Sequence, residues 1–241
     1  MKRLLVFLKY PTPGRVKTRL AEAIGAEAAA TIYRACVELT LERLRPLASE
    51  AIICAEPASA CGSVRAWLGS WWHVHPQVGQ TLGDRLAYAT GEAFEDGTRR
   101  VVCIGTDSPW LQPEHIEAAF SALEDAELVL GPTEDGGYYL IGLSRPAPAL
   151  FSRVAWSTPQ VLAQTQANAR ALGLRMRMLS VGYDVDRVED LQRFLDEERA
   201  RGTSSRWLRA LEGTSRDRSD HTGKGELERL ILELARGGHD A

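Results

Sequence analysis

The sequence lacks the signatures of several large enzyme classes. It contains no GxGxxG dinucleotide loop, no GxxxxGK[ST] phosphate loop, no GxSxG nucleophile elbow and no HExxH zinc motif. An excess of positive charge is also absent, because 29 basic side chains stand against 32 acidic ones and give a formal net charge of −3. A chain without excess positive charge does not attract nucleic acid or anionic lipid over its whole surface, so we expect no nucleic acid or membrane partner. Any phosphate binding must then depend on a local group of basic side chains.

Cysteine and long apolar runs are scarce as well. The 4 cysteines show no CxxC spacing, and two of them lie in apolar strand-like runs, where a thiol behaves as a small core residue. No stretch approaches the roughly 18 to 20 apolar residues of a membrane span. The run from Leu4 to Leu8 is too short for the core of a signal peptide and ends at Lys9. We therefore expect a cytoplasmic protein with reduced, structural cysteines.

Apolar runs of strand length alternate with helical patterns along most of the chain. Strands are predicted at 4–8, 51–55, 73–75, 101–105, 127–131, 138–143 and 176–179, and helices at 16–24, 27–47, 64–68, 82–94, 113–123, 158–172 and 188–199. This order predicts a three-layer α/β/α domain over residues 1–203 with a mostly parallel central sheet, in which the Asp-Gly-Gly turn at 135–137 adds an antiparallel element. Ligands of such sheets bind at the carboxyl ends of the strands, which indicates the loops after Leu8, Ile104 and Leu179.

Residues 204–241 are predicted to form a charged C-terminal extension with a polar linker at 213–225 and a short amphipathic helix at 227–234. We predict that the part beyond about Gly213 is dispensable for catalysis, because the linker is polar and the helix is short and isolated. The alternative is that this helix docks on the domain or on a second subunit, which leaves a homodimer open.

The loop after the first strand is rich in cations. Lys9, Arg15, Lys17 and Arg19 surround Gly14 where the chain enters the first predicted helix. Backbone N–H groups and the dipole at a helix start favour an anion, and cations placed there oppose the dipole unless a ligand compensates them. We interpret this loop as a phosphate-binding loop. The alternative is an ordinary solvated, basic helix start.

Aspartates follow two later strands. Asp107 lies at the tip of a buried strand, where it either caps the next turn or binds Mg²⁺ through one oxygen. Asp184 and Asp186 are two residues apart in an extended segment, so their side chains are predicted to project from the same face of that segment. Two carboxylates at such a short distance repel each other unless a cation lies between them. Asp186 is equally a candidate cap for the following helix, so capping and metal binding remain open for it.

Two further segments belong to the candidate site. Asp135, Gly136 and Gly137 suit a tight turn and a close backbone approach to a ligand, although Asp-Gly is also typical of an ordinary hairpin turn. In the segment 77–85, glycines and polar side chains are candidates for contacting a nucleotide base.

Taken together, the ordered segments KYPTPGRVKTRL, QTLGDR, GTDSP, GPTEDGGYYLIGL and DVDRVEDL resemble a bacterial family of GT-A-fold, nucleotide-diphospho-sugar transferase-like proteins. The family is a domain of unknown function, and some members are assigned as arsenosugar-pathway glycosyltransferases. The resemblance implies Mg²⁺ or Mn²⁺ held by Asp107 and Asp186, with Asp184 as a close contender. It also implies a metal-dependent glycosyltransferase that acts on a nucleotide-sugar and a small-molecule acceptor.

The resemblance assigns further roles in the same way. The implied catalytic residues are Asp107, Asp135 and Lys17. The implied nucleotide contacts are Lys9, Gly14, Lys17, Arg19, Gln80, Gly83 and Arg85, and the implied substrate contacts are Asp135, Gly136 and Gly137.

Two alternatives stay open beside glycosyl transfer. The KTRL segment also resembles the loop of phospholactate guanylyltransferases, which favours transfer of a nucleotide from a nucleoside triphosphate to a small phosphorylated acceptor. The first loop departs from the glycine-rich loop of sugar-nucleotide pyrophosphorylases, which argues against that activity. The other alternative is a nucleotide-binding module without turnover.

Overall fold

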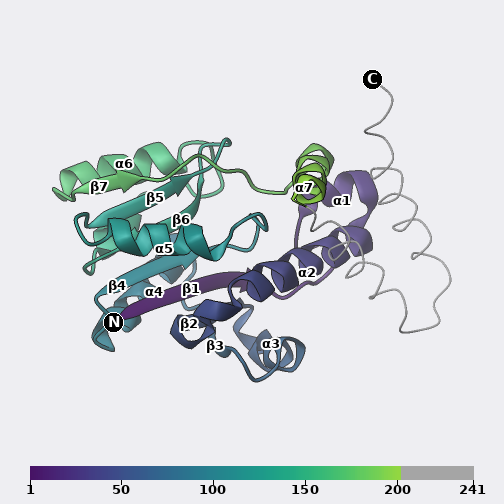
Figure 1. The fold of residues 1–241 in the computed structure, drawn as a ribbon, viewed down its shortest axis with the longest axis horizontal. Coiled ribbons are helices and arrows are strands. Elements are labelled where there is room, and N and C mark those ends of the chain that lie inside the picture. The colour runs from purple at the N-terminus through teal and green to yellow at the C-terminus, as the bar shows by residue number, and fades with distance from the viewer. Residues whose placement is uncertain (202–241) are drawn as a thin grey trace. The chain divides into compact units, whose positions relative to one another are not determined.

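The computed structural model describes residues 1–201, and the chain divides into two compact units (Figure 1). The first unit contains Met1–Tyr10 and Thr40–Asp184, and the second contains Pro11–Leu39 and the chain from Val185. The predicted extension at 204–241 lies outside the described residues. Within residues 1–201, no helix is both long enough and apolar enough to cross a membrane.

A seven-stranded sheet forms the centre of the first unit. Its strands are β1 (Lys2–Lys9), β2 (Ala51–Glu56), β3 (His73–Pro76), β4 (Arg100–Ile104), β5 (Leu128–Pro132), β6 (Tyr138–Leu143) and β7 (Met176–Met178), in the order β3-β2-β1-β4-β6-β5-β7. All pairs are parallel except those of β6, which is antiparallel to β4 and β5. The predicted mostly parallel sheet and its one antiparallel element are therefore confirmed.

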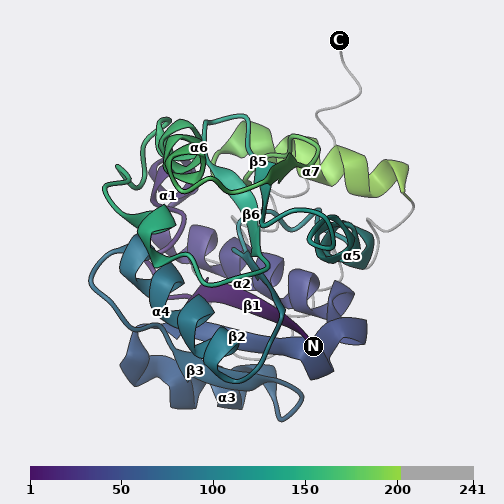
Figure 2. The same cartoon turned by 90° about the vertical axis from the view of Figure 1, so that its left-hand side faces the viewer.

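Helices cover both faces of this sheet, which explains why the inner strands β1, β4, β5 and β6 are apolar on both sides. They are α3 (Cys61–Leu68), α4 (Leu82–Glu95), α5 (Pro113–Ala122) and α6 (Val161–Ala171), with short 3-10 helices η1 (Arg45–Glu50), η2 (Ala58–Ala60) and η3 (Pro148–Phe151). Figure 2 shows α5 on one side of β6 and α6 on the other. Leu5 and Phe7 of β1 join a core cluster with Leu86 of α4 and Ala169 of α6.

The second unit contains α1 (Thr18–Ile24), α7 (Val188–Ala200) and most of α2 (Ala26–Arg43). Two predicted helix boundaries were wrong here. The helix predicted at 16–24 begins at Thr18, because Lys17 has a left-handed backbone with φ of 46°. The helix predicted at 27–47 ends at Arg43, because Pro46 cannot donate a helical hydrogen bond and disfavours a helical Arg45.

The four cysteines are buried and none forms a disulfide. Burial raises the pKa of the Cys54 thiol to about 12 and also raises that of Cys103. Their burial agrees with the predicted structural role, and their reduced state stays a prediction.

Candidate functional site

The carboxyl ends of the parallel strands lie at one edge of the sheet. Strand pairing places Lys9 opposite Glu56, Val6 opposite Ile104 and Leu130 opposite Met178. Predicted site residues of the first unit lie at the strand ends or on the segments that leave this edge, among them Lys9, Arg85, Asp107, Asp135 and Asp184. The first unit therefore gathers these residues at the edge where parallel sheets bind their ligands.

Trp110 fixes the loop after β4 against the loop after β7. Its indole N–H donates to the carbonyl of Tyr183 at 2.6 Å, and the two rings stack with their centroids 5.8 Å apart. The Trp110 ring also meets Tyr139 edge-on at 5.0 Å. Gly182 lies so close to the indole that a Cβ there would come within 2.1 Å of it. Aromatic packing of this kind holds the two loops that carry Asp107 and Asp184.

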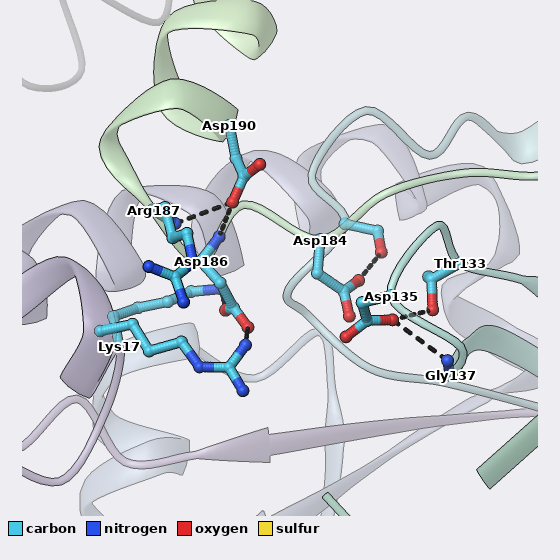
Figure 3. A network of polar contacts seen from close by, with 10 residues as sticks. Lys17, Thr133, Asp135, Gly137, Asp184, Asp186, Arg187 and Asp190 are labelled. Atoms are coloured by element: carbon cyan, nitrogen blue, oxygen red, sulfur yellow. Dashed lines mark hydrogen bonds and ion pairs between the residues drawn. The ribbon is translucent and has the colours of Figure 1, made fainter. Parts of the chain in front are cut away.

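A short hydrogen bond ties Asp184 directly to the Asp107 loop. The Ser108 hydroxyl donates to Oδ1 of Asp184 at 2.5 Å, and Ser108 is only 3% exposed. Figure 3 labels Asp184. Asp107 is the neighbour of Ser108 in the chain, and both carboxylates are partly exposed. The hydrogen bond therefore joins Asp184 and the loop that carries Asp107 in one constellation, although the two segments are far apart in sequence.

The donors of this constellation fit a hard divalent cation. Mg²⁺ takes one or two carboxylates from a protein and completes its octahedron with water and substrate phosphate oxygens. Asp107 and Asp184 offer such carboxylates at the ligand edge of the sheet. Within the described residues, no group of three or more His, Cys, Asp or Glu side chains is arranged to hold a metal ion.

The turn between β5 and β6 is stabilised by its own residues. Oδ1 of Asp135 accepts hydrogen bonds from the Thr133 hydroxyl at 2.6 Å and from the Gly137 N–H at 3.1 Å (Figure 3). Gly136 has φ of 88°, and a Cβ there would come within 2.2 Å of the Pro159 carbonyl oxygen. These contacts match the ordinary hairpin turn, so the catalytic and substrate-binding roles of Asp135, Gly136 and Gly137 stay predictions.

In the second unit, Lys17 and Asp186 form an ion pair. Lys17 Nζ lies 3.0 Å from Asp186 Oδ1, and both residues are labelled in Figure 3. Arg19 Nη1 lies 3.8 Å from Oδ2 of the same carboxylate. The Lys17 side chain is 2% exposed, whereas that of Asp186 is 34% exposed. The predicted phosphate-binding cations are therefore held by an acidic partner, and Gly14 is exposed in the loop that leads to them.

Asp190 caps α7. Its Oδ2 accepts hydrogen bonds from the N–H groups of Arg187 at 2.8 Å and Asp186 at 3.1 Å. The side chain of Asp186 does not cap this helix, because it contacts Lys17 and Arg19 instead. The alternative of a capping Asp186 was therefore wrong.

A polar network surrounds Arg85 at the carboxyl ends of β1 and β2. Arg85 Nη1 lies 2.7 Å from Glu56 Oε1, and its Nε donates to the Gly79 carbonyl at 3.1 Å. Gln77 donates from Nε2 to the carbonyls of Leu8 and Cys54 at 3.1 and 2.8 Å. The sequence analysis missed Glu56. Asp107 was predicted because it follows the end of a strand, and the same rule applied to β2 would have found Glu56.

The start of α4 has local structural reasons for its residues. The Thr81 hydroxyl and the Asp84 carboxylate form a reciprocal capping box, and the hydrogen bond from the Thr81 N–H lowers the pKa of Asp84. A Cβ at Gly83 would come within 2.8 Å of both the Phe151 carbonyl oxygen and the Trp156 indole nitrogen. Close packing therefore accounts for this glycine, and the nucleotide contacts predicted for Gly83 and the exposed Gln80 stay predictions.

Comparison with known proteins adds three relatives and a family. The family described as "Uncharacterized protein conserved in bacteria (DUF2064)" matches residues 40–158. A crystal structure from Desulfovibrio desulfuricans, described as a "putative nucleotide-diphospho-sugar transferase", is 31% identical with a TM-score of 0.80 and covers 97% of this chain and 96% of its own.

The other two relatives are curated phosphoenolpyruvate guanylyltransferases. The one from Sphaerobacter thermophilus is 28% identical over 73% of this chain and 84% of the relative. The one from Chloroflexus aggregans is 28% identical over 61% of this chain and 71% of the relative.

Proposed function

We propose a function for this chain, which belongs to the bacterial DUF2064 family of nucleotide-diphospho-sugar transferase-like proteins. In this proposal it transfers a nucleotide from a nucleoside triphosphate to a small acceptor in a metal-dependent reaction. The observation that supports the proposal is the hydrogen bond from Ser108 to Asp184, which joins Asp184 to the loop that carries Asp107 at the ligand edge of the sheet. The guanylyltransferase relatives support nucleotidyl transfer, since the similarity covers most of their length.

In this proposal Asp107 and Asp184 hold Mg²⁺ or Mn²⁺. The cation supplies stabilisation of charge on the phosphates of the nucleotide. Asp184 is the proposed second ligand because Ser108 ties it to the loop of Asp107, whereas Asp186 contacts Lys17 and Arg19. Ser108 fixes the direction of the Asp184 carboxylate, because its hydroxyl group donates a hydrogen bond to Oδ1.

The proposed phosphate contacts are Lys17 and Arg19, as their cationic charge suggests. A guanidinium binds phosphate through a planar pair of N–H donors, whereas an ammonium acts as a point charge. Asp186 orders both cations before a ligand arrives, which lowers the entropy that binding must spend on them.

Glycosyl transfer from a nucleotide-sugar is the second candidate. The Desulfovibrio structure, which covers 97% of this chain, is described as a "putative nucleotide-diphospho-sugar transferase". Both reactions need a metal ion bound to the phosphates of the nucleotide. Both also need basic side chains that neutralise the rest of the negative charge on these phosphates. They differ in the leaving group, which is pyrophosphate in nucleotidyl transfer and a nucleoside diphosphate in glycosyl transfer.

The leaving group therefore tests the proposal. The full chain is incubated with Mn²⁺ and either nucleoside triphosphates plus phosphoenolpyruvate and related acceptors, or nucleotide-sugars plus a panel of small alcohols. We expect pyrophosphate, and we expect Asp107→Ala to retain its fold and lose roughly a hundredfold or more in rate. Release of nucleoside diphosphate instead supports the second candidate. Nucleotide binding without either product overturns both and leaves a binding module.

A further inference from the structure

Glu56 is an acidic side chain held at the ligand edge of the sheet without a role in the reaction above. It is the last residue of β2, and its side chain is 28% exposed. Its carbonyl accepts a hydrogen bond from the Tyr10 N–H at 2.7 Å. Glu56 therefore stands beside the point where β1 ends and the predicted phosphate loop begins in the chain.

The carboxylate of Glu56 has a fixed direction. Arg85 Nη1 contacts Oε1 at 2.7 Å, and Arg85 is itself held by the Gly79 carbonyl and by Gln77 Oε1 at 3.4 Å. Gln77 in turn donates to main-chain carbonyls at the ends of β1 and β2. A partly exposed ion pair contributes little to stability, so stability alone does not account for the polar contacts of Gly79 and Gln77 that position Arg85 against Glu56.

The chemistry of the pair matches one base among the common four. A carboxylate has two oxygens with about four acceptor positions in total, so an oxygen that meets Arg85 can still accept another hydrogen bond. Guanine alone presents two adjacent donors on its Watson–Crick edge, the N1–H and the N2 amino group. Adenine and cytosine present a donor beside an acceptor, and uracil presents one donor between two acceptors.

We propose that Glu56, positioned by Arg85, selects a guanine base. This inference rests on the proposed nucleotide site and holds for either candidate reaction, because a guanosine triphosphate and a guanosine-diphospho-sugar carry the same base. Glu56 accepts hydrogen bonds from N1–H and the N2 amino group, and Arg85 is a positioning residue.

Equilibrium binding of nucleoside diphosphates to the full chain in Mn²⁺ tests the proposal without turnover. The probes are GDP, IDP, which lacks the N2 amino group, ADP, and XDP, which has a carbonyl oxygen at C2. We expect the wild type to prefer GDP over IDP and ADP by about tenfold or more, since a hydrogen bond to a charged group is lost. Glu56→Gln should weaken GDP binding about 10- to 100-fold and strengthen XDP binding, because the amide N–H can donate to the xanthine oxygen.

Glu124→Gln is the matched control. Glu124 pairs with Arg100 at 2.6 Å, and Arg100 begins β4 at the opposite edge of the sheet. This variant should keep the wild-type order of affinities, and thermal unfolding should show both variants folded. Equal wild-type affinity for GDP, IDP and ADP overturns the inference and leaves the nucleotide site intact. Weaker binding of all four probes by Glu56→Gln, without a gain for XDP, also overturns it. No binding of any diphosphate overturns the proposed function as well.

Discussion

Asp184 and Asp186 are two residues apart, yet they serve different regions of the molecule. Asp184 belongs to the first unit and accepts a hydrogen bond from a buried serine beside Asp107. Asp186 belongs to the second unit and contacts Lys17 and Arg19. Asp186 lies between two cations that compensate its charge, whereas the printed hydrogen bond of Asp184 ties it to the loop that carries Asp107. The difference separates a candidate metal ligand from an organiser of basic side chains.

The largest expected effect belongs to Asp184. Replacing it with alanine should lower metal-dependent turnover roughly a hundredfold, because several kcal/mol of charge stabilisation depend on the cation and about 1.36 kcal/mol corresponds to a factor of ten. Titration of Mn²⁺ against rate measures the half-saturating concentration in the wild type and the variant. If Asp184→Ala has the same Mn²⁺ response as the wild type, Asp184 is not a metal ligand.

Ser108→Ala sharpens the same side of the comparison. It removes the donor that orients Asp184 and leaves both carboxylates in place. A group that orients a metal ligand typically contributes about 10- to 100-fold in metal affinity, so we expect the half-saturating Mn²⁺ concentration to rise about tenfold.

Ser144→Ala is the control for the loss of a serine hydrogen bond. Ser144 donates to the Ala126 carbonyl at 3.1 Å, and Ala126 lies just before the amino end of β5. It should leave the Mn²⁺ response unchanged. An equal rise in both serine variants would show that the effect of Ser108 is a general loss of stability.

Most of the fold followed from the sequence, and the contacts of the site did not. The strand at Tyr138–Leu143 matches its predicted bounds, because an apolar run between a glycine turn and a polar segment has few other interpretations. The position of β6 between β4 and β5 is not encoded in any local pattern. Asp107 was predicted because it follows a buried strand, whereas Asp184 and Asp186 were predicted from their extended spacing in the loop after β7.

The partners of the two aspartates could not be predicted. The hydrogen bond of Asp184 to Ser108 joins residues 76 apart in sequence, and the ion pair of Asp186 with Lys17 joins residues 169 apart. Spacing alone favoured one shared face and one shared role for the two aspartates. Tertiary contacts, which a single sequence does not display, give each a different environment.

Asp186→Ala tests the other side of the comparison and should act mainly on stability. The Lys17 side chain is 2% exposed and loses a carboxylate partner, but Asp186 is 34% exposed, so the loss falls below that of a fully buried pair. We expect the free energy of unfolding to fall by about 1–2 kcal/mol, with an unchanged Mn²⁺ half-saturation.

Glu38→Ala is the matched control in the same unit. Glu38 pairs with Arg34 at 2.9 Å on an exposed face of α2, and its loss should cost no more than about 0.5 kcal/mol. If Asp186→Ala raises the Mn²⁺ requirement as much as Asp184→Ala does, the assignment of the two aspartates is reversed.

The smallest expected effect belongs to Asp190, a third aspartate of the same segment. It accepts hydrogen bonds from the N–H groups of Arg187 and Asp186, so alanine leaves two donors at the start of α7 without this acceptor. Loss of such a cap costs about 1 kcal/mol, and denaturant unfolding should show that decrease, while Asp190→Asn should retain most of the stability. Asp196→Ala, which removes an exposed ion pair with Arg199 in the same helix, should lower the free energy of unfolding by less.

The Mn²⁺ response of Asp190→Ala should equal that of the wild type, because the hydrogen bonds of Asp190 involve neither Lys17 nor the Asp107 loop. A metal effect from Asp190→Ala would mean that displacement of the segment alone disturbs the site, and the effects of Asp184 and Asp186 would then lose their separate meanings.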